Sequence, residues 1–284
     1  MHSRIFLTTG ILGLLALLPS CSPGAENKKT YKINQDNPVG TIPKASARAA
    51  AGGATAQASG ASGRSIAEEN DRYSFSFSYP AEAGRIAALK SWFDAQLEKD
   101  KAALLSDVAE AEKDAKENGY EYRGFSYGAE WQRVADTPRY LSLSATISSY
   151  SGGAHGNYGF DSLLWDKKAG KRMKPLDLFT SDTAFTASIV KAFCTQLDRQ
   201  RAKKREGLDD KSSIPEFDAC INPAENTVIL GSTDKVHFDK IGILIGPYSA
   251  GPYAEGAYEV TLPVTQAALQ AVKPEYRNAF RVKT

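Results

Sequence analysis

The stretch from residue 30 to residue 65 limits where this chain can fold. Its residues are mostly Ala, Gly, Ser, Thr, Asn, Gln and Lys, with very few large apolar side chains. Two Ala- and Gly-rich runs, 47–56 and 58–63, lie within it. Such a segment cannot bury enough apolar surface to offset the entropy of ordering. We therefore expect a flexible tether over residues 21–70, followed by a folded head.

The residues before the tether have the pattern of a secretory signal. An apolar run from Ile5 to Leu18 follows a short basic start and leads to small residues before Cys21. The run is too short to act as a stop-transfer helix. The order Leu18-Pro-Ser-Cys21 resembles a lipobox, in which the proline departs from the usual small or β-branched residue. We predict a signal peptide over residues 1–20 and lipidation of Cys21. The alternative is a plain secreted protein in which this cysteine is incidental.

Acyl chains on Cys21 would hold the mature protein on a membrane without spanning it, since each buried methylene contributes ~0.8 kcal/mol. Ser22, rather than Asp, follows the cysteine and resembles the sorting pattern of outer-membrane lipoproteins. We therefore expect a lipid-anchored protein at the periplasmic face of the bacterial envelope, on the outer membrane. The membrane is its first expected partner.

The charge balance argues against nucleic acid as a partner. The 284 residues carry a formal net charge of +2, and 24% of them are charged and 42% hydrophobic, as in ordinary globular proteins. Basic residues gather at 199–205, at the end of a predicted helix, where cations suit the carbonyl groups. The aromatic residues that would stack on bases are missing there.

Two cysteines, Cys194 and Cys220, remain in the predicted head. In an oxidising compartment such a pair is most simply a disulfide. Two buried free thiols are the alternative. A metal site is less favoured, because His237 is the only histidine near them in the sequence. We expect neither a metal nor a cofactor.

The first part of the head predicts a strand and a long helix. Aromatic and small residues alternate from Tyr73 to Tyr79, which places the rings on one face of a strand. Apolar residues then recur at helical spacing over 82–118, with Gly119 as the C-cap. This segment predicts one long amphipathic helix, or two with a break near Asp100.

The rest of the head predicts more strands and a second helix. The helix begins at 180–183 and places Phe185, Ile189, Phe193 and Leu197 on one face, and a short helix at 264–271 closes the chain. Strands are expected at 120–134, 139–150, 159–166, 227–231, 236–247 and 258–262. Blocks of strands and helices favour an α+β fold, with an antiparallel or mixed sheet packed against one long and one shorter helix. We divide it into an N-terminal α+β subdomain, 71–137, and a C-terminal α+β domain, 138–284.

The motif Gly124-Phe-Ser-Tyr-Gly128 has the spacing of a nucleophile elbow. That motif is functional only where a strand ends at the serine and a helix begins after it. Alternation continues beyond it, through Trp131, and predicts one uninterrupted strand. We therefore do not assign a catalytic role to Ser126.

Residues 148–157 surround one imidazole, that of His155, with glycines and other small residues. Such residues let backbone groups approach a ligand closely, and a histidine can serve as a general base, a metal ligand or a hydrogen-bond donor. A catalytic zinc needs three protein ligands, and the head has only one other histidine, His237. Asp161, Asp177 and Asp239 are not at a diagnostic spacing. The alternative to a ligand site is a tight turn with a hydrogen-bonded histidine.

Residues 246–256 form a second cluster of glycine, proline and tyrosine. Rigid loops that carry tyrosines make good recognition surfaces, because the ring supplies contact area and loses little rotamer entropy. The alternative is a crossover, stiffened by proline, whose rings complete the core.

The two clusters carry a family resemblance. The matching segments are 150–157, Phe160-Asp161, Gly170-Lys171, 176–179, and 245–256 with 259–263. They resemble the extracytoplasmic domain shared by lysozyme-sensing anti-sigma factors and by the N-terminal region of certain peptidoglycan deacetylases. The resemblance runs from about Tyr73 to the C-terminus, and its first part is similar to the companion domain usually found before it.

This resemblance implies an α+β head that binds something at the cell envelope and has no established catalytic activity of its own. The ligand of the sensors is lysozyme. This chain has the predicted lipid anchor in place of a transmembrane helix, and it has no sigma-binding segment and no deacetylase domain. Transmembrane signalling and carbohydrate deacetylation are therefore not carried over.

We expect a membrane-anchored binding head, rather than an enzyme, that recognises lysozyme-like proteins or peptidoglycan. The expected ligand-binding residues are Tyr150, Gly152, Gly153, His155, Asn157, Tyr248 and Tyr253. One alternative is a cell-wall-active hydrolase that uses His155 with an acidic partner such as Asp161, and another is a structural subunit of an envelope complex. Convergence of the two loops favours a site, and their separation favours a scaffold.

Overall fold

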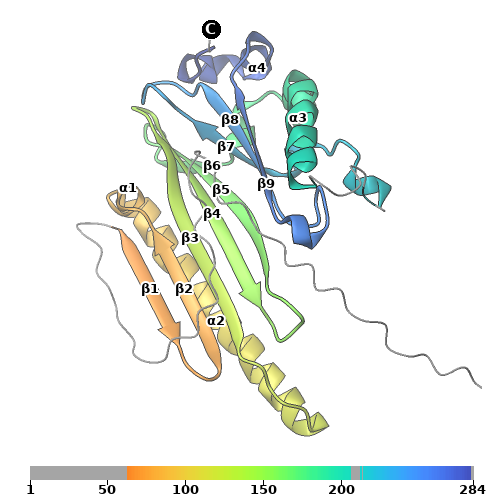
Figure 1. Cartoon of the computed structure of the whole chain (residues 1–284). Helices are drawn as coiled ribbons and strands as arrows, with labels where there is room; N and C mark the ends of the chain where they lie inside the picture. The colour runs from red at the N-terminus through yellow and green to blue at the C-terminus, as the bar shows by residue number, and fades with distance from the viewer. Residues whose placement is uncertain (1–62, 206–211, 213, 283–284) are drawn as a thin grey trace, which may run out of the picture. The chain divides into compact units, whose positions relative to one another are not determined.

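The computed structural model describes residues 63–205, 212 and 214–282 (Figure 1). The expected signal peptide at 1–20, the lipidation of Cys21 and most of the tether at 21–70 lie outside the described residues. No helix within the described ranges is long and apolar enough to cross a membrane.

A mixed sheet of six strands has the order β1-β2-β3-β4-β5-β6. The strands are β1 (Arg64–Glu69), β2 (Tyr73–Tyr79), β3 (Phe125–Asp136), β4 (Tyr140–Tyr150), β5 (Asn157–Asp166) and β6 (Lys171–Met173). Strands β2 and β3 are parallel, and the other neighbours are antiparallel. A parallel pair needs a crossover, which is the helical segment between β2 and β3.

Helix α2 (Ala87–Asn118) packs on one face of this sheet, after a single helical turn, α1 (Ala81–Gly84). Its buried side chains share one stripe, and they pack against the rings of β2: Leu89, Phe93, Leu97, Leu104 and Val108. Gly119, with φ 72°, ends the helix as predicted.

The predicted break near Asp100 is wrong, and the single long helix is confirmed from Ala87 onward. The polar residues at this point are bonded to the sheet. Asp100 accepts a hydrogen bond from Tyr127 Oη at 2.9 Å, and Lys101 pairs with Glu68 at 2.6 Å. They therefore hold the helix on the sheet instead of interrupting it.

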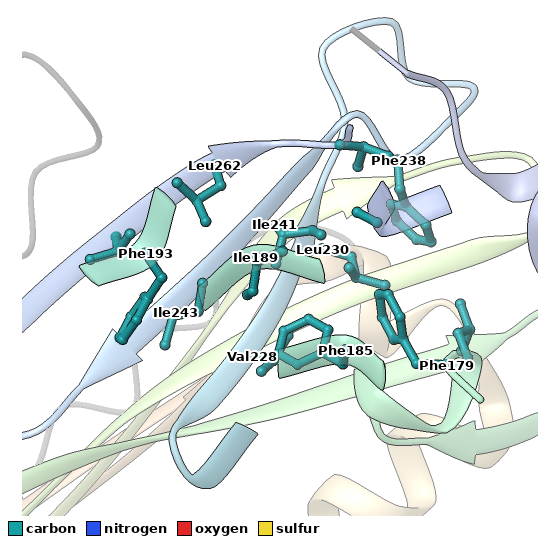
Figure 2. Close-up of a cluster of buried hydrophobic side chains, with 14 of the residues drawn as sticks. Phe179, Phe185, Ile189, Phe193, Val228, Leu230, Phe238, Ile241, Ile243 and Leu262 are labelled. Carbon is teal, nitrogen blue, oxygen red and sulfur yellow. The ribbon is translucent and has the colours of Figure 1, made fainter. Parts of the chain in front are cut away.

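A second, antiparallel sheet has the order β7-β8-β9. Its strands are β7 (Thr227–Gly231), β8 (Lys240–Ile245) and β9 (Tyr258–Pro263), and it packs with α3 (Asp182–Lys204) and α4 (Gln266–Ala271). Figure 2 shows Phe185, Ile189 and Phe193 of α3 in the core that this sheet shares with α3. Short 3-10 helices lie at Pro175–Leu178, Pro215–Phe217, Pro223–Glu225, Tyr253–Glu255 and Pro274–Ala279.

The predicted α+β class, with one long and one shorter helix on a mixed sheet, is confirmed. The expected domain boundary at residue 137 falls in the turn between β3 and β4. These strands pair from Ser126↔Tyr150 to Asp136↔Leu141, and β7 packs against β3, β4 and β5. The described residues all fall in one compact unit.

The predicted disulfide between Cys194 and Cys220 is confirmed, with the two Cα atoms 5.5 Å apart. It joins α3 to the segment that leads into β7. The bond spans 26 residues and thus restricts the unfolded chain.

Replacing both cysteines by serine should lower the free energy of unfolding by about 3 kcal/mol, because the unfolded chain regains its loop entropy. Chemical denaturation of the purified head, without reductant, measures the change. Reduced wild-type protein serves as the control and should unfold at the same denaturant concentration as the double variant. A loss under about 1 kcal/mol would contradict this role of the bond.

Candidate ligand-binding site

The two glycine- and tyrosine-rich loops meet in the structure. The His155 ring, in the β4–β5 loop, stacks on Tyr253 of the β8–β9 loop, with centroids 4.0 Å apart and planes inclined by 24°. The Tyr248 ring lies beside Tyr253 at 5.5 Å. We call these three rings the ring platform. Segments almost a hundred residues apart in sequence therefore form one surface.

Two hydrogen bonds join the loops beneath the rings. Tyr253 Oη donates to the carbonyl oxygen of Gly156 at 2.6 Å. The backbone N–H of Ala257 donates to Tyr158 Oη at 2.9 Å. Tyr253 of the β8–β9 loop and Tyr158 of β5 thus each bond to the backbone of the other segment, and these two bonds hold the segments together.

His155 is held by oxygen atoms of the loops. Its Nδ1 lies 2.8 Å from the Gly156 carbonyl oxygen, which can only accept, so Nδ1 carries a hydrogen. Its Nε2 lies 3.4 Å from Tyr248 Oη. Among the described residues no carboxylate bonds to His155. Asp161 occupies β5, on the α2 side of the sheet by strand alternation, and accepts from the Ser162 N–H. The arrangement orients a ring and does not pair it with an acid.

Tyr248 has an unusual backbone for a residue with a side chain. Its φ is 67°, in the left-handed region, and 51% of its surface is exposed. Such a conformation costs of order 1–3 kcal/mol and persists only where the surroundings enforce it. An exposed aromatic side chain on a strained backbone position favours a role for Tyr248 in ligand recognition.

The basic end of α3 supports the β8–β9 loop. Buried Arg201 donates from Nε to the Ala250 carbonyl oxygen at 2.9 Å. Lys204 Nζ donates to the carbonyl oxygen of Glu255 at 2.7 Å and also to that of Ala257. The sequence predicted these cations at the end of a helix, where they interact favourably with the free carbonyl groups. In the structure they also bind the loop that carries two of the three rings.

The Glu255 carboxylate accepts several of the hydrogen bonds that hold the β8–β9 loop. It accepts from Arg205 Nε at 2.7 Å and from the hydroxyl of Tyr258. Burial, and then the hydrogen bond to Glu255, raise the pKa of Tyr258, and the hydrogen bond to Glu255 raises that of Arg205. A side chain at Gly251 would collide with the Glu255 carboxylate, which would then have to move. Arg205 also pairs with Asp218, two residues from the disulfide, which links the loop to that bond.

Of the predicted ligand-binding residues, the structure brings His155, Tyr248 and Tyr253 together. The remaining four lie elsewhere on the hairpin. Tyr150 ends β4 opposite Ser126, Gly152 (φ 83°) lies near the Phe125 ring, Gly153 has open space beside it, and Asn157 accepts from the Tyr158 N–H. None of these four contacts the stacked rings in the described part of the chain, and their role in binding stays a prediction.

Sequence reasoning missed Tyr158 and the supporting residues of α3 and the loop. Tyr158 directly follows the glycine and histidine motif, and this position was a usable signal. The partnership of Arg201, Arg205 and Glu255 had no signal, because it joins residues about fifty positions apart.

The described residues, 63–205 with 212 and 214–282, contain no cluster of three His, Cys, Asp or Glu side chains able to hold a metal ion. His237 instead lies 3.1 Å from an Asp234 carboxylate oxygen. Ser126 is inside β3, with no helix after it, so the elbow geometry is absent.

Residues 66–158 match the family model described as deacetylase PdaC. A DUF3298 family protein from Bacteroides fragilis NCTC 9343 has the same fold, with a TM-score of 0.52 and 18% identity over 76% of this chain and 95% of that one. A DUF3298 family protein from Pseudomonas aeruginosa PAO1 has a TM-score of 0.41 and 15% identity over 78% of this chain and 97% of that one. No curated protein matches. The family-model match over residues 66–158 confirms the predicted resemblance to a deacetylase-associated domain of unknown function.

Replacing Lys204 with Met should loosen the β8–β9 loop, because the Glu255 and Ala257 carbonyl oxygens lose their shared donor. We expect amide hydrogens of residues 250–257 to exchange about tenfold faster, a change of ~1.4 kcal/mol in local opening. Mass spectrometry of exchange measures this directly. The neighbouring exposed Lys203→Met is the matched control. Equal exchange in the two variants would contradict the supporting role.

Proposed function

We propose that this chain is a lipid-anchored envelope protein whose head binds peptidoglycan through the ring platform, without catalysis. The convergence of the two loops into one stacked aromatic surface carries the proposal. Sugar rings have flat C–H faces that stack on aromatic rings, while their hydroxyls bond to polar groups around them. The Tyr248 hydroxyl belongs to the platform, and exposed Ser249 follows Tyr248 in the chain, so both are polar groups available for such bonds.

The rigidity of the platform supports binding. Tyrosine has few rotatable bonds, and both loops are fixed to each other and to α3 before any ligand arrives. A prearranged surface loses little conformational entropy on binding. The absence of an acidic partner for His155 among the described residues supports recognition over hydrolysis.

A lysozyme-like protein is the second candidate ligand. Exposed tyrosines are frequent binding hot spots in protein interfaces, and Tyr248 is such a residue. The resemblance to lysozyme-sensing domains supports the same candidate. Both ligands belong to the cell envelope, in keeping with the deacetylase-associated match over residues 66–158.

The anchoring part of the proposal rests on the sequence alone. The apolar run and the lipobox-like order before Cys21 support export and acylation. The tether would then place the head in the periplasm, beside the outer membrane and within reach of the wall.

Tyr248→Ala should weaken binding to purified peptidoglycan about tenfold, because it removes an exposed ring and leaves in place the Tyr253 and Tyr158 hydrogen bonds between the loops. Retention on insoluble wall and calorimetry with soluble fragments measure the change. Tyr120→Ala is the control, since Tyr120 is 53% exposed and its hydroxyl bonds to Asp114 of α2 and not to the three rings. Retention on immobilised lysozyme instead of the wall would favour the second candidate, and no retention on either at micromolar concentration would refute both.

Radiolabelled palmitate should enter the wild-type protein and should not enter a Cys21→Ser variant, because the thiol is the site of acylation. Fractionation should find the wild-type protein in the outer membrane. Equal label in both proteins, or none in either, would refute the anchor without affecting the binding proposal.

A further inference from the structure

Basic side chains gather on the antiparallel hairpin that β5 forms with β6. Lys167, in its turn, pairs with Asp136. The other cations of this segment are exposed, and we call them the basic hairpin: Lys168, Lys171, Arg172 and Lys174. None of them forms an ion pair with a residue in the described part of the chain. Their charges are therefore available to a partner.

The acids beside the basic hairpin do not cancel its charge. Buried Asp166 already pairs with Arg139 at 2.9 Å. The exposed Asp177 carboxylate accepts the Lys174 N–H at 2.8 Å, and Asp161 interacts electrostatically with the Lys174 side chain. These two acids weaken the field around Lys174 and leave the tip of the hairpin cationic.

The backbone of the turn is held rigidly. The Asp166 carboxylate accepts the N–H groups of Lys168 and Ala169 at 2.9 and 3.0 Å. Gly170, with φ 63°, donates to the Asp166 carbonyl oxygen at 2.8 Å. Only the side chains of the basic hairpin need to be ordered when a partner binds, which limits the entropy lost.

The basic hairpin lies at the end of the sheet where β1 begins. Arg64, the first residue of β1, donates to Asp94 of α2 at 2.7 Å. Arg172 lies over the ring of Trp92, on the same helix, with its guanidinium 4.5 Å from the ring centroid. The chain that precedes β1, with the predicted anchor at Cys21, therefore joins the head beside the basic hairpin. The ring platform is at the opposite end, where β4 leads into β5.

That opposite end carries more acids than bases. The last turns of α2 lie there, since Arg72, just before β2, pairs with Glu112. Over residues 110–123 the acids are Glu110, Glu112, Asp114, Glu117 and Glu121, and the bases are Lys113, Lys116 and Arg123. The head is thus polarised, and its cationic end is the one next to the chain that leads to the predicted anchor.

We propose that the basic hairpin binds the phosphate groups of anionic phospholipids, on the membrane that the anchor proposed above would enter. Lysines attract the negative surface, and Arg172 can also donate paired hydrogen bonds to a phosphate. A long tether alone leaves the head free to turn. Contact through the basic hairpin orients it, with the ring platform directed away from the lipid and towards the wall.

The mature chain with Cys21→Ser, which carries no acyl group, separates this contact from the anchor. Co-sedimentation with phosphatidylcholine vesicles that contain about one-third phosphatidylglycerol measures binding. We expect saturable binding to these vesicles and none to pure phosphatidylcholine. Raising the ionic strength from about 0.1 M to about 1 M should release the protein, because the screening length falls from about 10 Å to about 3 Å.

Replacing all four cations of the basic hairpin with glutamine should weaken vesicle binding about a hundredfold, since each basic residue at an anionic surface contributes roughly fivefold. The matched control removes the same charge from exposed cations elsewhere: Lys99→Gln, Lys113→Gln, Lys116→Gln and Arg123→Gln. This control should keep the wild-type affinity. Equal losses in the two variants would overturn the proposal, because net charge alone would then explain binding.

Energy transfer to acceptor-labelled lipids tests the orientation. A fluorophore on Ala169→Cys, in the turn of the hairpin, should transfer more strongly than one on Asn118→Cys, at the end of α2. The 32 residues of this helix span about 48 Å, so the two positions differ clearly in distance from the lipid. Equal transfer, or no binding to anionic vesicles, would refute the contact. Palmitate labelling and retention on the wall are separate readouts, so its failure is distinguishable from failure of the anchor or of the ring platform.

Discussion

The ion pair between Arg205 and Glu255 is the interaction on which the candidate site depends. Glu255 also accepts from the Tyr258 hydroxyl, and Arg205 pairs with Asp218 beside the disulfide. Removing Arg205 would leave the largely buried Glu255 carboxylate without its cation, which commonly costs about 3–5 kcal/mol. The position of the ring platform therefore follows from the end of a helix and from a covalent bond, both outside the loops themselves.

The molecule separates its supporting and presenting elements. The sheet under α2 and the core of α3 with β7–β9 are closed by large buried rings, among them Phe93 and Phe193. The loops attach to these layers at their edges and display exposed rings, with Tyr248 held at positive φ. Binding residues on loops that a rigid scaffold positions are a common arrangement in proteins. The structure therefore suits a protein that recognises its ligand through a surface already formed before binding.

Much of the fold follows from local patterns, and the site follows from them only in part. Alternation of aromatic and small residues predicted the limits of Tyr73–Tyr79, and helical spacing predicted the four buried apolar residues of α3, because burial and periodicity act on neighbouring positions. The start of β3 lies five residues later than predicted, since the 120–124 segment keeps a strand-like sequence without a pairing partner in the sheet. The loops could be recognised as special from glycine, histidine and tyrosine. Their contact, and the role of Arg201 and Arg205, depend on tertiary pairing, which a single sequence does not encode in any local pattern.

In the function that we propose, His155, Tyr248 and Tyr253 form one binding surface for an envelope glycan. The most direct measurement is the titration of isotope-labelled head with soluble peptidoglycan fragments, followed through the ring signals of these residues. We expect saturable shifts of all three rings with one common dissociation constant, and unchanged signals on β1 and β2. Shifts confined to other regions, or ring signals that stay unchanged at saturation of the wall fragments, would contradict it.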